Sequence, residues 1–149
     1  MSYKRLIFVC TGNTSRSPMA KAIYERMDEE KQLEVLDRGL VVLFSEPANP
    51  KVSTVLKNND LNIDSHVATM LEAGDITEDT LILTMTRKQR DSVMEKFEEA
   101  KNVYAIKEFV GYEGDVMDPY GGTLLDYEGC FDELSKLVKK TIYKLGEED

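Results

Sequence analysis

The sequence predicts an α/β fold of three layers, in which a four-stranded parallel sheet is flanked by helices. Short apolar runs alternate with helical patterns along the chain. Strands separated by helices imply right-handed βαβ units, and therefore a parallel sheet that is covered on both faces. The 149 residues, of which 42% are hydrophobic and 32% charged, suit a single domain spanning residues 1–149.

The first half of the chain is expected to supply two strands and two helices. Residues 4–9 are predicted as a buried strand, and residues 33–40, which alternate apolar and polar side chains, as a second strand. Asn49-Pro50 is a cap followed by a first-turn proline and predicts a short helix to about residue 58. Residues 18–29 have the apolar spacing of a helix, with three side chains on its core face: Met19, Ile23 and Met27.

The second half continues this alternation. Residues 80–85 are predicted as the third strand, after which Thr86 caps a helix to about residue 100. Residues 103–106 form a short fourth strand, and residues 111–123 are irregular. A final helix over residues 126–145 has an apolar stripe made of Phe131, Leu134, Leu137, Val138 and Ile142.

Composition argues against several classes of protein. A formal net charge of −9 disfavours binding to a nucleic-acid backbone. There is no signal peptide and no apolar run long enough to cross a bilayer, so we expect no membrane partner and a cytoplasmic location. The two cysteines, Cys10 and Cys130, give neither a disulfide framework nor a C-x-x-C pair, which disfavours a thioredoxin-type centre and a cysteine-rich zinc site.

The most informative motif begins where the first predicted strand ends. It is a run followed directly by Pro18: Cys10-Thr11-Gly12-Asn13-Thr14-Ser15-Arg16-Ser17. Backbone N–H groups at the start of a helix lack intrahelical partners and form a ready anion site. Gly12 would help the loop to curl around an oxyanion, and Arg16 offers a planar fork of donors that matches two phosphate oxygens. The run therefore predicts a phosphate-binding loop after strand 1.

The same loop would activate a thiol. The amide dipoles, the helix N-terminus and Arg16 all favour the thiolate form of Cys10, which can attack phosphorus. Ser17 is expected as the helix N-cap with Pro18 at the first helical position, or else with its hydroxyl turned toward the thiolate. The C-x5-R spacing by itself is weak evidence, and the alternative is a buried cysteine ending a core strand beside a solvated Arg16.

A second group of residues lies in the irregular stretch. Asp115 precedes the run Asp118-Pro119-Tyr120-Gly121-Gly122, in which Asp-Pro and paired glycines fix a turn and expose the Asp118 carboxyl group. When a thiolate attacks phosphorus, the leaving group needs a proton. Asp118 is the predicted general acid, and then the general base for water; the alternative is that Asp118 merely caps the turn.

With these two motifs, the chain resembles the low-molecular-weight protein tyrosine phosphatases over its whole length. The family pattern is C-x5-R-S near the N-terminus and Asp-Pro near the C-terminus, matched here at residues 10–17 and 118–119. The resemblance implies one low-molecular-weight phosphatase domain and a two-step reaction that needs no metal or other cofactor. In this reading Cys10 is the nucleophile, Arg16 binds the phosphoryl group and Asp118 is acid and then base.

The resemblance also implies supporting residues. Asn13 would shape the loop by hydrogen bonding, and Ser17 would support the thiolate. His66 looks like a family histidine that hydrogen-bonds near the loop; a locally satisfied or exposed histidine without a catalytic role is the alternative. The predicted phosphate- and substrate-binding residues are Thr11, Gly12, Asn13, Thr14, Ser15, Ser17 and Tyr120.

Thr14 bears on the choice of substrate. Family members that act on phosphotyrosine usually carry an apolar residue there, whereas the Thr-Gly-Asn-Thr version looks like the bacterial protein-arginine phosphatase branch, as do residues 107–110 and 118–122. A hydroxyl at Thr14 would orient a guanidinium phosphoramidate, and isoleucine would favour a flat ring. Tyr120 would form a wall for either substrate. Phosphoarginine is therefore favoured, with phosphotyrosine as the alternative.

Ser15 departs from a common family pattern. Many members have a second cysteine directly before the loop arginine, which forms a reversible disulfide with the nucleophile. With Ser15 in its place, Cys10 is expected to oxidise more readily to irreversible acids. The simplest reading of Cys130 is a small core residue of the last helix.

Other functions compete with this reading. A phosphocarrier domain of a sugar transport system also holds phosphate on a cysteine after the first strand, but it has less use for an Arg16–Asp118 pair. An arsenate reductase needs further cysteines, a catalytically dead module would lose key residues, and a nucleotide-binding P-loop needs a glycine-rich Lys-Ser/Thr pattern. The expected partners are a phosphorylated protein and, in the loop, inorganic phosphate or another oxyanion.

Overall fold

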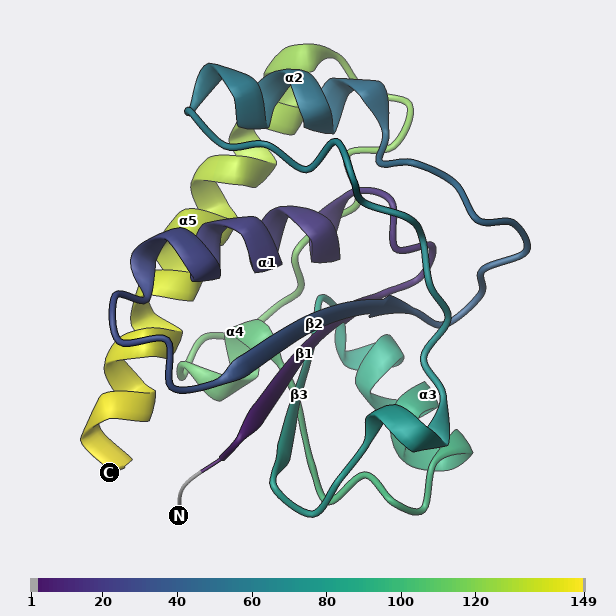
Figure 1. The fold of residues 1–149 in the computed structure, drawn as a ribbon, viewed down its shortest axis with the longest axis vertical. Helices are drawn as coiled ribbons and strands as arrows, with labels where there is room; N and C mark the ends of the chain where they lie inside the picture. Colours follow the sequence, from purple (N-terminus) through teal and green to yellow (C-terminus); the bar gives the residue numbers. More distant parts are fainter. Residues whose placement is uncertain (1–2, 149) are drawn as a thin grey trace.

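Figure 1 shows a sheet with helices on both of its faces. The structure is a computed structural model that describes residues 3–148. The strands, all parallel, are β1 Arg5–Cys10, β2 Glu34–Gly39, β3 Thr80–Thr84 and β4 Asn102–Ala105, in the spatial order β2-β1-β3-β4. The helices are α1 Arg16–Met27, α2 Pro50–Asn58, α3 Arg87–Lys96, α4 Ile106–Phe109 and α5 Leu124–Glu148, with a 3₁₀ turn at Ala73–Asp75.

Strand β1 supplies side chains to two apolar layers. Leu6 and Phe8 are fully buried in the larger cluster, together with side chains of α1, α2, α4 and α5. Ile7 and Val9 point the other way, into a smaller cluster that includes Val93 of α3. Figure 1 likewise places α1 and α5 on one face of the sheet and α3 on the other. The predicted three-layer fold with a four-stranded parallel sheet is confirmed.

The start of α1 differs from the prediction. The helix begins at Arg16 rather than at residue 18, so Pro18 is its third residue and Ser17, expected as the N-cap, lies inside the helix. Proline is tolerated there because the first N–H groups of a helix have no intrahelical partner. Met27, predicted as core, is 39% exposed because it is the last residue of the helix.

Capping residues explain how α3 and α5 begin. Thr86 and Gln89 bond each other's backbone N–H groups across the first turn of α3, which confirms the predicted cap at Thr86. Thr123 and Asp126 form the same kind of pair before α5, so this helix begins at Leu124 rather than at residue 126. The predicted cap at Asn49 is confirmed by its bond to the Lys51 N–H.

The region around β4 differs from the prediction more than the start of α1 does. Helix α3 ends at Lys96 rather than near residue 100, because Phe97 adopts an extended backbone and is buried in the smaller cluster. The sequence predicts no helix at α4. Ile106, assigned to the strand, instead starts this short helix, whose Glu108 carboxylate accepts from the Ala105 N–H.

All strands of the sheet end at one edge because they are parallel. Ligands of open α/β sheets bind beyond this carboxyl edge. Strand β1 is central in the sheet, and its last residue, Cys10, lies at that edge. The fold thus brings the predicted nucleophile to the expected place. Within residues 3–148, no helix combines the length and the apolar character needed to span a membrane.

Candidate active site

The predicted phosphate-binding loop connects β1 directly to α1. Cys10 is the last residue of the strand and Arg16 is the first residue of the helix. Both are almost fully buried, Cys10 at 3% and Arg16 at 5% exposure, so the alternative of a solvated arginine is wrong. The first-turn amides of α1 face the end of β1, which is the arrangement that binds anions.

The Ser17 hydroxyl contacts the Cys10 thiol. The oxygen–sulfur distance is 2.9 Å, and Ser17 is fully buried. Asn13 Nδ2 donates to the same hydroxyl oxygen at 2.8 Å. The Ser17 hydroxyl also lies 3.5 Å from the Arg38 carbonyl oxygen, so it can either donate to the Cys10 sulfur or accept from the thiol. Of the two orientations left open by the sequence, the structure has the one directed at the thiol.

Asn13 holds the loop through both its side chain and its backbone. Its φ of 58° lies in the left-handed region, which asparagine tolerates better than most residues. Its Oδ1 accepts from the Thr69 N–H at 2.8 Å, and its Nδ2 also donates to Asp37 at 2.7 Å. His66 Nε2 bonds the Asn13 carbonyl at 2.7 Å. Strand β2 and the stretch of residues 66–69 therefore fix the curvature of the loop.

Asp37 is a site residue that the sequence reasoning missed. It lies on β2 with 6% exposure, and its carboxylate contacts both Asn13 and His66, the latter at 3.4 Å from Nδ1. A signal was present, because Asp37 falls on the same strand face as the buried Val35. The His66 ring bridges the Asn13 carbonyl and the Asp37 carboxylate, and it does not contact the thiol. The predicted hydrogen bond of His66 near the loop is confirmed.

Arg16 joins the loop to the second predicted group. Its Nη1 donates to the Val116 carbonyl at 2.9 Å, and its Nη2 lies 3.6 Å from Asp118 Oδ2. The other carboxylate oxygen of Asp118 accepts from the Tyr120 N–H at 3.0 Å. Asp118 therefore caps its turn, and its other carboxylate oxygen faces the loop arginine.

The remaining loop residues make backbone contacts. The Thr11 carbonyl accepts from the N–H groups of Leu40 and Val41, and the Thr14 carbonyl accepts from that of Asn49. The Thr14 hydroxyl faces Gly12, since it lies 3.9 Å from where a Cβ on Gly12 would be. Ser15 is buried and Tyr120 is 80% exposed at the rim.

Gln89 was also missed. Its Nε2 donates to the Thr11 hydroxyl at 3.0 Å, and its Oε1 accepts from the N–H groups of Met85 and Thr86. The side chain thus ties the loop to the end of β3 and the start of α3. The Thr-x-x-Gln spacing could have identified the cap but not the contact with Thr11.

Two ionisable side chains of α5 lie behind the loop. Burial raises the pKa of Cys130 to about 12, and the residue is 7% exposed, so its assignment to the core of the last helix is confirmed. Burial and then the Asp118 carboxylate raise the pKa of Tyr127. In the described part of the chain, no three His, Cys, Asp or Glu side chains are grouped as metal ligands.

Comparisons with known proteins agree with this geometry. The family described as "Low molecular weight phosphotyrosine protein phosphatase" matches residues 5–149. A protein-arginine-phosphatase of Geobacillus stearothermophilus is 38% identical over 146 residues, which is 95% of each chain.

Two solved structures are similar over nearly their full length. The YwlE arginine phosphatase from Geobacillus stearothermophilus has a TM-score of 0.90 and 35% identity, covering 97% of this chain and 94% of that one. The low molecular weight protein tyrosine phosphatase from T. tengcongensis has a TM-score of 0.90 and 39% identity, covering 95% of this chain and 99% of that one.

Proposed function

The chain belongs to the low molecular weight phosphotyrosine protein phosphatase family, and from that premise we propose that it hydrolyses phosphoarginine side chains of proteins through a phosphocysteine intermediate. As a member of this family the protein is a protein phosphatase. The reaction needs no metal in this proposal, because the buried thiol, the loop amides and Arg16 supply the nucleophile and the anion site.

In the first step, the Cys10 thiolate attacks phosphorus and an S–P bond forms. The bond between phosphorus and the guanidinium nitrogen breaks, and Asp118 gives its proton to that nitrogen. The loop N–H groups and Arg16 hold the three phosphoryl oxygens, where negative charge develops. The Ser17 hydroxyl, 2.9 Å from the sulfur, stabilises the thiolate before attack.

In the second step, water attacks the phosphocysteine. Asp118, now a carboxylate, takes a proton from the water as the O–P bond forms and the S–P bond breaks. Inorganic phosphate leaves and the Cys10 thiolate is restored. The position of Asp118 beside Arg16, on the open side of the loop, supports both of its roles.

The substrate assignment is based on Thr14. Its hydroxyl lies near Gly12 of the loop, and the hydroxyl oxygen can accept a hydrogen bond from a phosphoramidate N–H. Relatives named for arginine and for tyrosine occur at nearly equal identity, 38% and 39%, so overall similarity does not decide between them. Tyr120, exposed at the rim, would stack on a guanidinium plane or on a ring.

One assay tests the assignment. Peptides of one sequence carrying phosphoarginine or phosphotyrosine are compared for the wild type and Thr14→Ile. We expect the wild type to prefer phosphoarginine and Thr14→Ile to shift toward phosphotyrosine by about tenfold or more, the scale of one lost polar contact. A wild type that prefers phosphotyrosine would contradict the arginine assignment, and phosphotyrosine is the second candidate function.

Binding of other molecules follows from the same site. Inorganic phosphate, sulfate and vanadate should occupy the loop as competitive inhibitors, because they present the same tetrahedral oxygens. Activity should survive EDTA, and its loss would contradict a metal-free reaction. We propose a cytoplasmic location, because Cys10 and Cys130 are both free thiols and a thiolate nucleophile needs a reducing compartment.

A further inference from the structure

A groove runs away from the loop along helix α3. Its lining includes Arg16 and Asp118 of the candidate site together with Lys88, Ser92 and Lys96 of α3. The spacing of the three α3 residues, each four apart, places them in a row on one face of the helix. The row extends the site outward from the point where the phosphoryl group would sit.

The walls of the groove are mixed in character. Val41 and Met117 contribute exposed apolar surface, 58% and 75% exposed, on the side facing α3. Gln89, which bonds the Thr11 hydroxyl, forms part of the floor. Such a surface suits an extended peptide, because the apolar side chains can pack against the peptide while Lys88 and Lys96 attract its acidic side chains.

The two lysines of the groove have no acidic partner among the described residues. No carboxylate oxygen among the described side chains lies within salt-bridge distance of either Lys88 or Lys96. The Lys96 Nζ atom lies 5.7 Å from the ring centroid of Phe97, the next residue in the chain. Asp91 of the same helix pairs with Arg90, away from the groove.

Two neighbouring lysines without an acidic partner among the described side chains are unusual in a chain with this excess of acidic residues. The chain has 28 acidic and 19 basic residues, so an unpaired lysine row beside an anion-binding loop runs against the overall charge. A local positive field of this kind attracts anionic groups even when the net charge is negative. The row is therefore placed where it can act on a bound substrate.

We propose that the α3 groove, through Lys88 and Lys96, binds acidic side chains of the substrate protein next to its phosphorylated residue. The proposal rests on the proposed phosphatase function. Eight helical residues separate the two lysines, a rise of about 12 Å, which an extended peptide covers in about four residues. Glu or Asp within a few residues of the phosphorylated position would reach the row.

The test compares two peptides with the same phosphorylated residue, whichever the wild type hydrolyses faster. One carries flanking glutamates and the other glutamines, and each kcat/KM is divided by that for p-nitrophenyl phosphate. We expect the wild type to favour the glutamate peptide about three- to tenfold, since exposed pairs are weak individually. Lys88→Ala/Lys96→Ala should abolish the preference, and added salt should reduce it.

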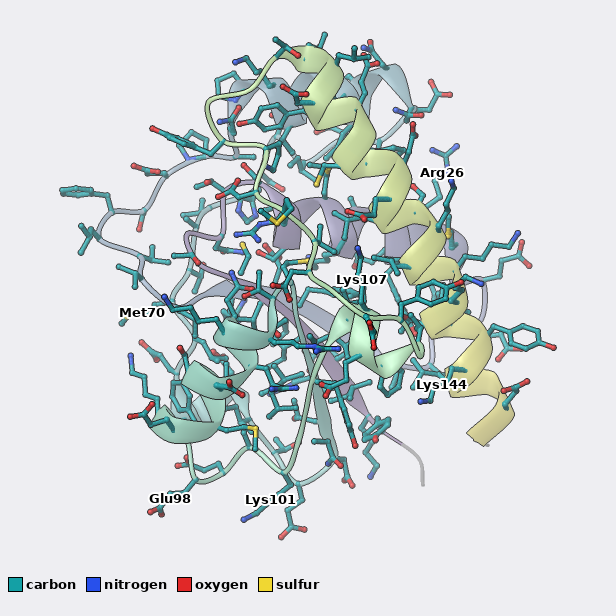
Figure 2. All side chains as sticks on the ribbon, turned by 180° about the vertical axis from the view of Figure 1, so that it is seen from behind. Arg26, Met70, Glu98, Lys101, Lys107 and Lys144 are labelled. Atoms are coloured by element: carbon teal, nitrogen blue, oxygen red, sulfur yellow. The ribbon has the colours of Figure 1, made fainter. Side chains whose placement is uncertain are left out.

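A charge-matched variant provides the control. Lys136 and Lys139 are exposed on α5 (yellow in Figure 2), on the other side of the molecule from α3. Lys136→Ala/Lys139→Ala removes the same charge and should keep the preference. If the wild type does not prefer the glutamate peptide, or if the preference survives Lys88→Ala/Lys96→Ala, the proposal that this groove binds acidic side chains is overturned.

A binding measurement separates this outcome from failure of the proposed function. Cys10→Ala, which has no nucleophile at the end of β1, is titrated with both labelled peptides, with and without the two groove substitutions. Tighter binding of the glutamate peptide, lost with Lys88→Ala/Lys96→Ala, would support the groove even if hydrolysis were absent. Equal binding of the two peptides would count against it whatever the activity.

Discussion

The two halves of the candidate active site are held in opposite ways. In the loop of residues 10–17 the side chains nearest the thiol are buried, and Asn13 and Arg16 bond to Asp37 and to the Val116 carbonyl outside the loop. The segment that carries Asp118 is open, with the Asp118 side chain 48% exposed against 6% for Arg16. Its carboxylate has only the Tyr120 N–H and the Arg16 guanidinium as partners in the described chain.

The difference matches the chemistry of each half. A site for developing phosphoryl charge works best when its donors are already in place, because no reorganisation is then needed in the transition state. An acid that must reach varied leaving groups has to stand at the open side, where the substrate enters. Under the proposed function, the buried half would supply the common phosphate chemistry and the exposed half would meet the variable part of the substrate.

The largest expected effect is on the buried half. Cys10→Ser should reduce kcat/KM on p-nitrophenyl phosphate on the order of 10⁴-fold or more, because a serine hydroxyl is a much weaker nucleophile than a cysteine sulfur. The variant should keep its fold, since a hydroxyl occupies a similar volume. Circular dichroism and thermal melting check the fold, and substantial residual turnover would show that another group is the nucleophile.

The exposed half should be next in size. Asp118→Asn should lower kcat by about 10²–10⁴-fold on a peptide substrate, the usual contribution of a general acid. The loss should be smaller on p-nitrophenyl phosphate, whose leaving group needs little help from a proton. Equal losses on both substrates would mean that Asp118 acts through Arg16, 3.6 Å away, rather than as the acid.

The third prediction tests whether the loop depends on its buried support. Asp37→Ala leaves one Asn13 Nδ2 hydrogen and His66 Nδ1 without their carboxylate partner, and should destabilise the protein by about 1–3 kcal/mol. Urea unfolding measures the free energy. The matched control is Asp64→Ala, which breaks the Lys57–Asp64 pair, 59% exposed on both sides, and should cost less than about 0.5 kcal/mol. Similar losses in both variants would contradict a special role for the network.

The smallest effect concerns oxidation of the same loop. Ser15 offers no second thiol, and Cys130, with a pKa near 12, stays a neutral thiol at physiological pH and is a poor partner for disulfide exchange. Prolonged peroxide should therefore inactivate Cys10 in a way that thiol reductant does not reverse. Ser15→Cys should make much of the loss recoverable. Full recovery of the wild type, or a Cys10–Cys130 disulfide found by mass spectrometry, would contradict this prediction.

Local signals account for what could be predicted. The apolar runs gave the sheet and its helices, and the caps at Asn49 and Thr86 were correct. Cys10 and Arg16 could be assigned because strand, loop and helix are contiguous there. Asp118 could be proposed because the proline and the glycines that form its turn follow it directly in the sequence.

What could not be predicted depends on distant partners. Asp37 lies 24 residues from the Asn13 amide it accepts from, Gln89 lies 78 residues from Thr11, and the Val116 carbonyl lies 100 residues from Arg16. Asp37, Gln89 and Arg16 could each bond several other groups, and the residues next to them in the sequence do not indicate which. Ser17 shows the consequence, since the sequence favoured a helix cap and the structure turned its hydroxyl to the thiol.

The sequence by itself determined the α/β fold and the phosphate-binding chemistry, because strand and helix periodicity, the Cys10–Arg16 spacing and the Asp-Pro turn are all encoded within short stretches. The tertiary structure alone decided which buried groups orient that chemistry and which surface continues it. Buried polar groups must find partners when the chain packs, so the Asp37 and Gln89 contacts and the lysine row beside the loop emerge only once distant segments come together.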